Sequence, residues 1–214
     1  MCSIPSAKST KGTFTFQKSK IMNTCAKKLT QWLIENRAIE ATDKELYEYA
    51  FYSIGITISP FVIVLIFGLW MGVPIEGVTM VLPFMCIRKY SGGYHAKSAR
   101  TCFISSCIVL MICLWLVTKI RYGIWLGIFV FVSVCSIAYF SPIDSENRRL
   151  EEDEIQDCKK KSILISIVFL CLKIVFLILG LENFTVAISV GMILSAGLQF
   201  PAIVKNMCNE KDKK

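Results

Sequence analysis

The chain has 214 residues, of which 54% are hydrophobic and 19% are charged, and its formal net charge is +8. So much apolar sequence with so little charge excludes an ordinary soluble domain. The positive charge is a membrane-topology signal. No nucleic-acid partner is predicted, because no aromatic-rich soluble module accompanies the basic residues.

The first elements of the chain are polar and then amphipathic. Residues 1–21 are rich in Ser, Thr and Lys, and we expect them to form a disordered basic extension. Cys25, Leu29 and Trp32 then recur at helical spacing, with lysines between them. This pattern predicts an amphipathic helix over residues 22–37. It lies either on the cytoplasmic membrane surface or, as an ordinary helix, against the loops.

Six apolar blocks follow, and most approach the roughly 20 residues that cross the hydrocarbon core of a bilayer. We therefore predict an all-α, polytopic membrane helical bundle of about six transmembrane helices. It forms a single domain over residues 22–205, followed by a charged cytoplasmic tail at 206–214. The spans are expected near residues 50–72, 73–87, 103–118, 122–140, 162–180 and 183–204.

The basic residues predict the orientation of these spans. With the N-terminus inside, 21 of the 24 Lys and Arg residues fall in the N-terminal region, the 88–101 loop, the 141–161 loop and the C-terminal tail. Lys119 and Arg121 fall outside. The positive-inside rule therefore predicts a multi-pass protein of the cell membrane, with both termini and both long loops in the cytoplasm and with membrane lipids as neighbours.

The last two spans carry unusual residues. Lys173 lies within an apolar block, where a cation either pairs with a carboxylate or snorkels toward water. The last span has a small-residue face that suits either close packing within the chain or self-association into a homodimer. That face consists of Gly191, Ser195, Ala196 and Gly197.

The polar segment between the second and third spans, RKYSGGYHAKSARTC at residues 88–102, is the candidate site. His95 is the only histidine of the chain, and histidine titrates near neutral pH, so it can take a proton from a thiol. Cys102 lies seven residues later, at the start of the third span. A helix dipole there favours the thiolate, which is the reactive form of cysteine. The pair predicts a cysteine nucleophile with a histidine base at a membrane surface.

The neighbours of this pair support the same chemistry. Ser91, Gly92 and Gly93 permit a tight turn whose backbone amides can bind an anion or an oxyanion. Positive charge nearby lowers the pKa of a thiol. The basic side chains of the segment are Arg88, Lys89, Lys97 and Arg100.

Two points about the pair stay open. A straight helix over residues 95–102 would separate the two side chains by about 10.5 Å of rise. Either the chain folds back, or another segment or subunit completes the site. No third orienting group is evident, and Asp144 and Glu146 of the 141–161 loop are candidates. The plainer alternative is a surface histidine beside a packing cysteine.

No metal or other cofactor is predicted. The ten cysteines form no C-x-x-C pair, and a single histidine makes a zinc site unfavourable.

The 88–102 segment resembles the AgrB family, the membrane-embedded cysteine endopeptidases of Gram-positive peptide quorum sensing. Its Arg, Gly, His-Ala and Cys keep the spacing of that family. The segment SPIDSENRR at residues 141–149 is similar to the family's Ala-Pro loop, although the adjacent Arg148 and Arg149 replace a longer basic run. The resemblance extends from about residue 22 to the C-terminus.

The resemblance implies a partner, an AgrD-type propeptide with an amphipathic leader, an internal Cys or Ser, and an acidic C-terminal tail. It implies that Cys102, assisted by His95, removes the tail through an acyl-enzyme thioester. The product is a cyclic thiolactone or lactone autoinducing peptide. We expect the basic side chains of Arg88, Lys89, Arg148 and Arg149 to receive the acidic tail; the alternative is that they only set the topology and touch lipid headgroups. The alternatives are a small membrane transporter or peptide-export component without peptidase chemistry, and a structural membrane scaffold.

Overall fold

The computed structural model describes residues 20–91, 99–142 and 152–201. Over these ranges the chain is an all-α membrane helical bundle, as predicted, with a short 3-10 turn at Ala41–Asp43. Nearly all of the predicted N-terminal extension and the whole predicted tail lie outside these ranges. The helices are α1 (Lys20–Glu35), α2 (Lys44–Met71), α3 (Pro74–Ser91), α4 (Ala99–Lys119), α5 (Ile124–Phe140), α6 (Glu152–Ile178) and α7 (Glu182–Gly197).

Each predicted span corresponds to one helix from α2 to α7. Three stretches are long and apolar enough to cross a membrane, namely Lys44–Met71, Glu154–Ile178 and Glu182–Pro201. Shorter apolar helices lie at Ile104–Lys119 and Ile124–Phe140. The remaining helix, α3, has 18 residues and is therefore about 27 Å long, slightly less than a typical hydrocarbon core. Six crossings therefore stay a prediction.

Two helices begin well before their apolar blocks. α2 starts at Lys44, ahead of the span expected from residue 50, and α6 starts at Glu152, ahead of the span expected from residue 162. Charged residues such as Glu and Lys are good helix formers, so a helix continues past the membrane boundary. In α6 the Lys161 amine lies 3.8 Å from a carboxylate oxygen of Asp157, one turn earlier. Half of the predicted 141–161 loop is therefore helical.

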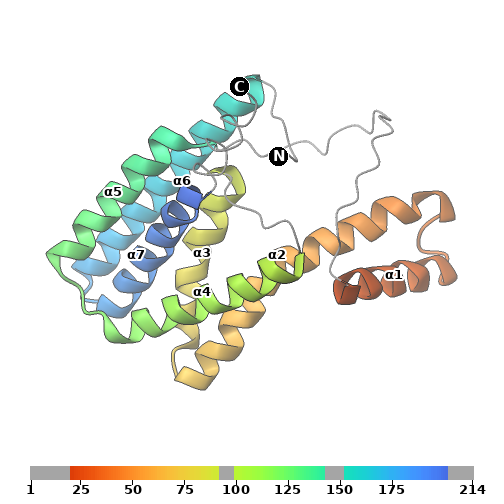
Figure 1. Cartoon of the computed structure of the whole chain (residues 1–214), viewed down its shortest axis with the longest axis horizontal. Coiled ribbons are helices and arrows are strands. Elements are labelled where there is room, and N and C mark those ends of the chain that lie inside the picture. Colours follow the sequence, from red (N-terminus) through yellow and green to blue (C-terminus); the bar gives the residue numbers. More distant parts are fainter. Residues whose placement is uncertain (1–19, 92–98, 143–151, 202–214) are drawn as a thin grey trace.

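α7 lies inside the bundle and contacts α3, α4, α5 and α6 (Figure 1). Every residue from Thr185 to Met192 is buried, so α7 is covered on all sides there. Its closest approach is to α3 at Gly191, where an added Cβ would collide with the carbonyl oxygen of Met80. The absence of a side chain at Gly191 lets the two backbones touch.

The predicted small-residue face of α7 thus packs within the chain. One turn after Gly191, the Ser195 hydroxyl lies 3.1 Å from the Gly191 carbonyl oxygen and 3.5 Å from that of Phe84 on α3. Ala196 is also buried. Gly197 is different, because a Cβ there would meet no atom within 4 Å. These contacts keep α3 and α7 in a fixed register.

Two apolar clusters fill the bundle. The first joins α2, α3, α4 and α7 through Val64, Met80, Leu114 and Val186. The second joins α3, α5 and α7, with residues of α6 packed against it, and its members are Ile87, Val130, Ile137, Ile188, Met192 and Ala196. Large apolar side chains also remain exposed on the outer faces of several helices, as expected of a surface that faces lipid. They include Ile58, Ile66, Ile108, Ile112, Phe129, Phe131, Leu164 and Val168.

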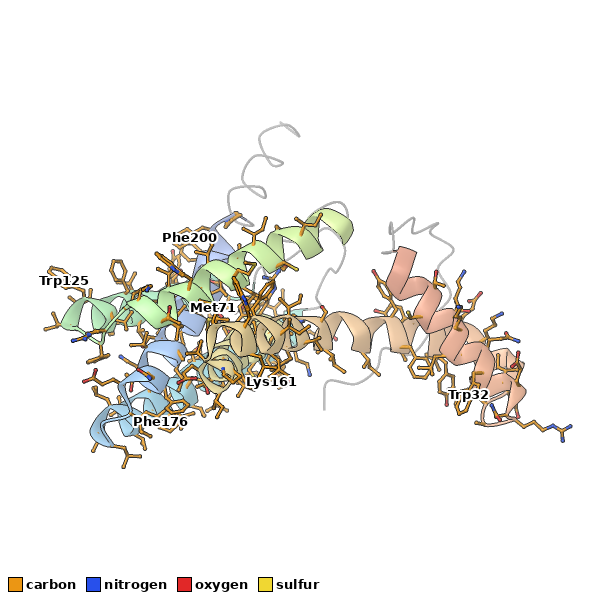
Figure 2. All side chains as sticks on the ribbon, turned by 90° about the horizontal axis from the view of Figure 1, so that it is seen from below. Trp32, Met71, Trp125, Lys161, Phe176 and Phe200 are labelled. Atoms are coloured by element: carbon orange, nitrogen blue, oxygen red, sulfur yellow. The ribbon has the colours of Figure 1, made fainter. Side chains whose placement is uncertain are left out.

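α1 is the predicted amphipathic helix, displaced by two residues. It contacts α2 and buries Ala26 and Thr30, whose hydroxyl donates to the Ala26 carbonyl oxygen at 2.9 Å. Leu29 and Trp32 stay 45% and 58% exposed. Figure 2 shows Trp32 and Trp125 at opposite ends of the molecule. α1 therefore packs against α2, away from the other helices (Figure 1), and still presents an apolar stripe.

Helices α2 to α7 alternate in direction, so each helix terminus belongs to one of two ends of the bundle; at one of them the starts of α2 and α4 lie to the right of the ends of α3, α5 and α7 (Figure 1). We call the end where α3, α5 and α7 finish, and where α4 and α6 begin, the loop end. Arg88 and Lys89 of α3 and Lys159, Lys160 and Lys161 of α6 lie there, whereas Lys119 and Arg121 lie at the opposite end. This separation of charge is the pattern on which the predicted orientation rests.

Lys173 is buried in α6, and its amine lies 5.3 Å from the centroid of the Tyr122 ring. Tyr122 belongs to the turn between α4 and α5, at the end opposite to the loop end. Among the residues that the structure describes, an aromatic face thus takes the place of the carboxylate that the sequence allowed as a partner. The contact ties α6 to this turn through a cation–π interaction.

Candidate functional site

The structure describes the flanks of the candidate site. Cys102 and Arg100 belong to α4 by their backbone, and their side chains lie outside the description. The pairing of His95 with Cys102 is therefore untested. The predicted site residues outside the described ranges are Gly92, Gly93, His95, Lys97, Asp144, Arg148 and Arg149.

The upstream flank is the last turn of α3. The Arg88 guanidinium lies 5.5 Å from the centroid of the Phe84 ring, one turn back along the same helix. The Lys89 amine lies 5.7 Å from the ring of Tyr90. Cation–π contacts of this kind hold long basic side chains close to the helix surface. Two positive charges are thus fixed just before the Gly-Gly segment.

Ser91 is the last residue of α3 and is fully buried. The two glycines that follow it lie outside the described residues, so the turn expected of the three stays a prediction. The candidate segment therefore begins directly at the buried end of α3.

The downstream flank is the start of α4. This helix begins at Ala99, so Cys102 is its fourth residue and completes its first turn, as the sequence predicted. The free backbone N–H groups of a helix start favour a nearby anion, and a thiolate is an anion. Because α4 begins at the loop end, this cysteine lies at the same end as the basic end of α3.

Some of the other described cysteines lie deeper in the helices. Cys107 and Cys113 follow Cys102 into the apolar part of α4, and Cys113 is buried. Cys86, Cys135 and Cys158 instead lie near the loop ends of α3, α5 and α6, and of these three Cys158 is buried. Within the described ranges no group of three His, Cys, Asp or Glu side chains could hold a metal ion.

The sequence did not single out one group of polar residues at the loop end. Ser141, Ser162 and Gln199 are all buried there, and Gln199 is completely so. A glutamine within the last apolar block was the available signal, since polar side chains at membrane depth are often functional.

Comparisons with known proteins point to one family. The family model described as accessory gene regulator B (AgrB) matches residues 26–200. An AgrB-like protein of Clostridium perfringens is 30% identical over 145 residues, which cover 64% of this chain and 68% of the relative. The accessory gene regulator protein B of Staphylococcus carnosus is 28% identical over 141 residues, which cover 62% and 68%. No solved structure matches the chain.

The matched region begins within α1 and ends just after α7. It therefore includes every helix of the bundle, the segment that carries His95, and Cys102. Because a family model matches most of its length, this chain belongs to the accessory gene regulator B family.

Proposed function

We propose that this protein is a membrane-embedded cysteine endopeptidase that matures an AgrD-type propeptide. Membership of the AgrB family supports the coarser part of this proposal, a role in agr quorum sensing. The chemistry rests chiefly on one observation, the position of Cys102 in the first turn of α4 at the basic loop end. The only histidine of the chain precedes it by seven residues.

The first half of the reaction forms an acyl-enzyme. His95 takes the thiol proton, and the Cys102 sulfur attacks the carbonyl carbon at the end of the ring-forming segment. The C–N bond then breaks, and the proton passes from His95 to the departing amine of the tail. The positive end of the α4 dipole stabilises the thiolate before the attack.

The second half closes the ring. The internal thiol or hydroxyl of the peptide attacks the thioester carbonyl, and the Cys102 sulfur leaves and regains a proton. A thioester keeps the acylating power of the cleaved bond, so a thiolactone forms at little cost in free energy. Water would instead give a linear peptide, and a site that excludes water therefore favours the ring.

Basic side chains at the loop end suit the acidic tail of the substrate. Arg88 and Lys89 end α3, and Arg148 and Arg149 belong to the segment that links α5 to α6. Both segments leave the same end of the bundle. Attraction between exposed charges steers binding more than it tightens it.

The predicted orientation is part of the proposal. The loop end faces the cytoplasm, where the propeptide is made, and the turn with Lys119 faces outward. A membrane transporter without peptidase chemistry is the alternative. Its main support was Lys173, a cation within a span, and the Tyr122 ring gives that cation a structural role.

Co-expression with an AgrD-type propeptide tests the proposal. Mass spectrometry should find the released tail and a cyclised peptide with the native protein, and neither with Cys102→Ala. Cys107→Ala and Cys158→Ala are matched controls, because one shares α4 and the other shares the loop end. Both should keep activity. Tail release by a correctly inserted Cys102→Ala variant would end the cysteine-peptidase proposal.

A further inference from the structure

Within the part of the chain that the structure describes, three buried side chains at the loop end have polar atoms without a hydrogen-bond partner. Gln199 is 0% exposed, and both its Nε2 and its Oε1 are unpaired. The hydroxyls of Ser162, 0% exposed, and Ser141, 3% exposed, are unpaired as well. An unpaired polar group in an apolar interior loses its hydration without compensation, so such groups are rare.

The three residues belong to one layer. Ser162 lies on α6, Ser141 is the C-cap residue of α5, and Gln199 follows α7 by two residues; each of these helices contacts the other two. The second apolar cluster contains Ile137 and Ala196, with Ile165 packed against it. Ser141, Gln199 and Ser162 each lie three or four residues from one of these, toward the loop end. We call them the polar layer, and it closes the apolar core just below the loops.

Other buried hydroxyls in the same helices behave differently. Ser133, Ser166 and Ser189 each donate to the carbonyl oxygen four residues earlier, at 2.7, 2.9 and 2.7 Å. This is the ordinary way in which a membrane helix satisfies a hydroxyl. Ser136, deeper in α5, also has an unpaired hydroxyl. The polar layer is distinct because its unpaired atoms gather on three adjoining helices and include a complete carboxamide.

We propose that the polar layer binds a peptide group of the propeptide, an inference that rests on the proposed function. A carboxamide offers a donor and an acceptor, which match the C=O and N–H of one peptide unit. The two hydroxyls can each donate or accept a further bond. None of the three side chains carries a charge, so the layer suits a neutral ligand and not an ion.

The closed state of the layer fits this role. A peptide group enters when the ends of α5, α6 and α7 separate slightly. No hydrogen bond between the three side chains has to break for that movement, because none exists. Binding then satisfies donors and acceptors that the described residues leave unpaired, and it holds the propeptide backbone at the end of the bundle where α4 begins, with Cys102 in its first turn.

Equilibrium binding tests the inference. The parent is Cys102→Ala, which cannot turn over the substrate, and the probe is a fluorescently labelled synthetic AgrD-type propeptide added to protein in lipid nanodiscs. Gln199→Met keeps the length of the side chain and removes its hydrogen bonds. It should weaken Kd about tenfold, the typical effect of one to two lost hydrogen bonds. Ser162→Ala should weaken it several-fold.

Ser189→Ala is the matched control, because that buried hydroxyl already bonds within α7. It should leave Kd unchanged, and the thermal midpoint of Gln199→Met should equal or exceed that of the parent. Unchanged Kd in both Gln199→Met and Ser162→Ala would overturn the inference and leave the layer a site for water. If Gln199→Met does not fold, Ser162→Ala decides alone. Failure of the parent itself to bind the propeptide would refute the proposed function, and this inference with it.

Discussion

Gly191→Ala should loosen the contact between α3 and α7. The new Cβ would meet the Met80 carbonyl oxygen and lie 2.8 Å from Cγ of Pro83. A backbone carbonyl in a helix cannot rotate away, and a proline ring has little freedom, so the two helices must separate. Overpacking of this kind costs about 1–3 kcal/mol, and the rigid obstacle places it near 3. Alanine returns about 1 kcal/mol through its higher helix propensity.

The expected net loss is thus about 2 kcal/mol, which corresponds to a fall in Tm of about 4–8 °C for a chain of this size. Circular dichroism of the purified protein in detergent measures it. Gly197→Ala is the control on the same helix, because its Cβ would meet nothing within 4 Å. That variant should match or exceed the native Tm. Equal Tm values for the two variants would refute the close α3–α7 contact.

Three further predictions concern other parts of the bundle. A cysteine in place of Lys119, on a background without native cysteines, should react with a membrane-impermeant thiol reagent added outside intact cells; reaction only after permeabilisation would reverse the proposed orientation. Tyr122→Leu should lower Tm, because it leaves the buried Lys173 amine without its aromatic partner, and Lys173→Met, which removes the charge, should change Tm by less. A larger fall in Tm for Lys173→Met than for Tyr122→Leu would show that the cation–π contact is unimportant. Joint replacement of Arg148 and Arg149 by Glu should slow processing of the native propeptide, and a Lys in the acidic tail should partly restore it; a normal rate with correct insertion would show that these arginines do not bind the tail.

Much of this fold could be predicted from sequence because membrane helices carry their signal locally. An uninterrupted apolar block predicts a helix wherever water is absent, and all six blocks are helical. The start of α4 near Cys102 could be predicted for the same reason, since the block begins there. The start of α6 at Glu152 could not, because hydropathy marks the membrane boundary and not the end of the hydrogen-bonded helix.

The site shows a similar division. The chemical types of His95 and Cys102, with their spacing, were enough to suggest a nucleophile and a base. The burial of Ser91 and Gln199 depends on which helices meet, and hydropathy along one helix does not encode that. The sequence predicted that Gly191 belongs to a packing face, because small residues indicate one. Only the structure identifies α3 as the helix that packs there.

Direct detection of the acyl-enzyme tests the central claim. A propeptide whose internal Cys or Ser is replaced by Ala cannot close the ring, so the thioester on Cys102 should accumulate. Mass spectrometry of the intact protein should then find it heavier by the mass of the truncated propeptide less one water, digestion should locate the adduct on Cys102, and hydroxylamine should remove it. His95→Ala should form it far more slowly. Tail release without any adduct on Cys102, or an adduct on another residue, would contradict the account.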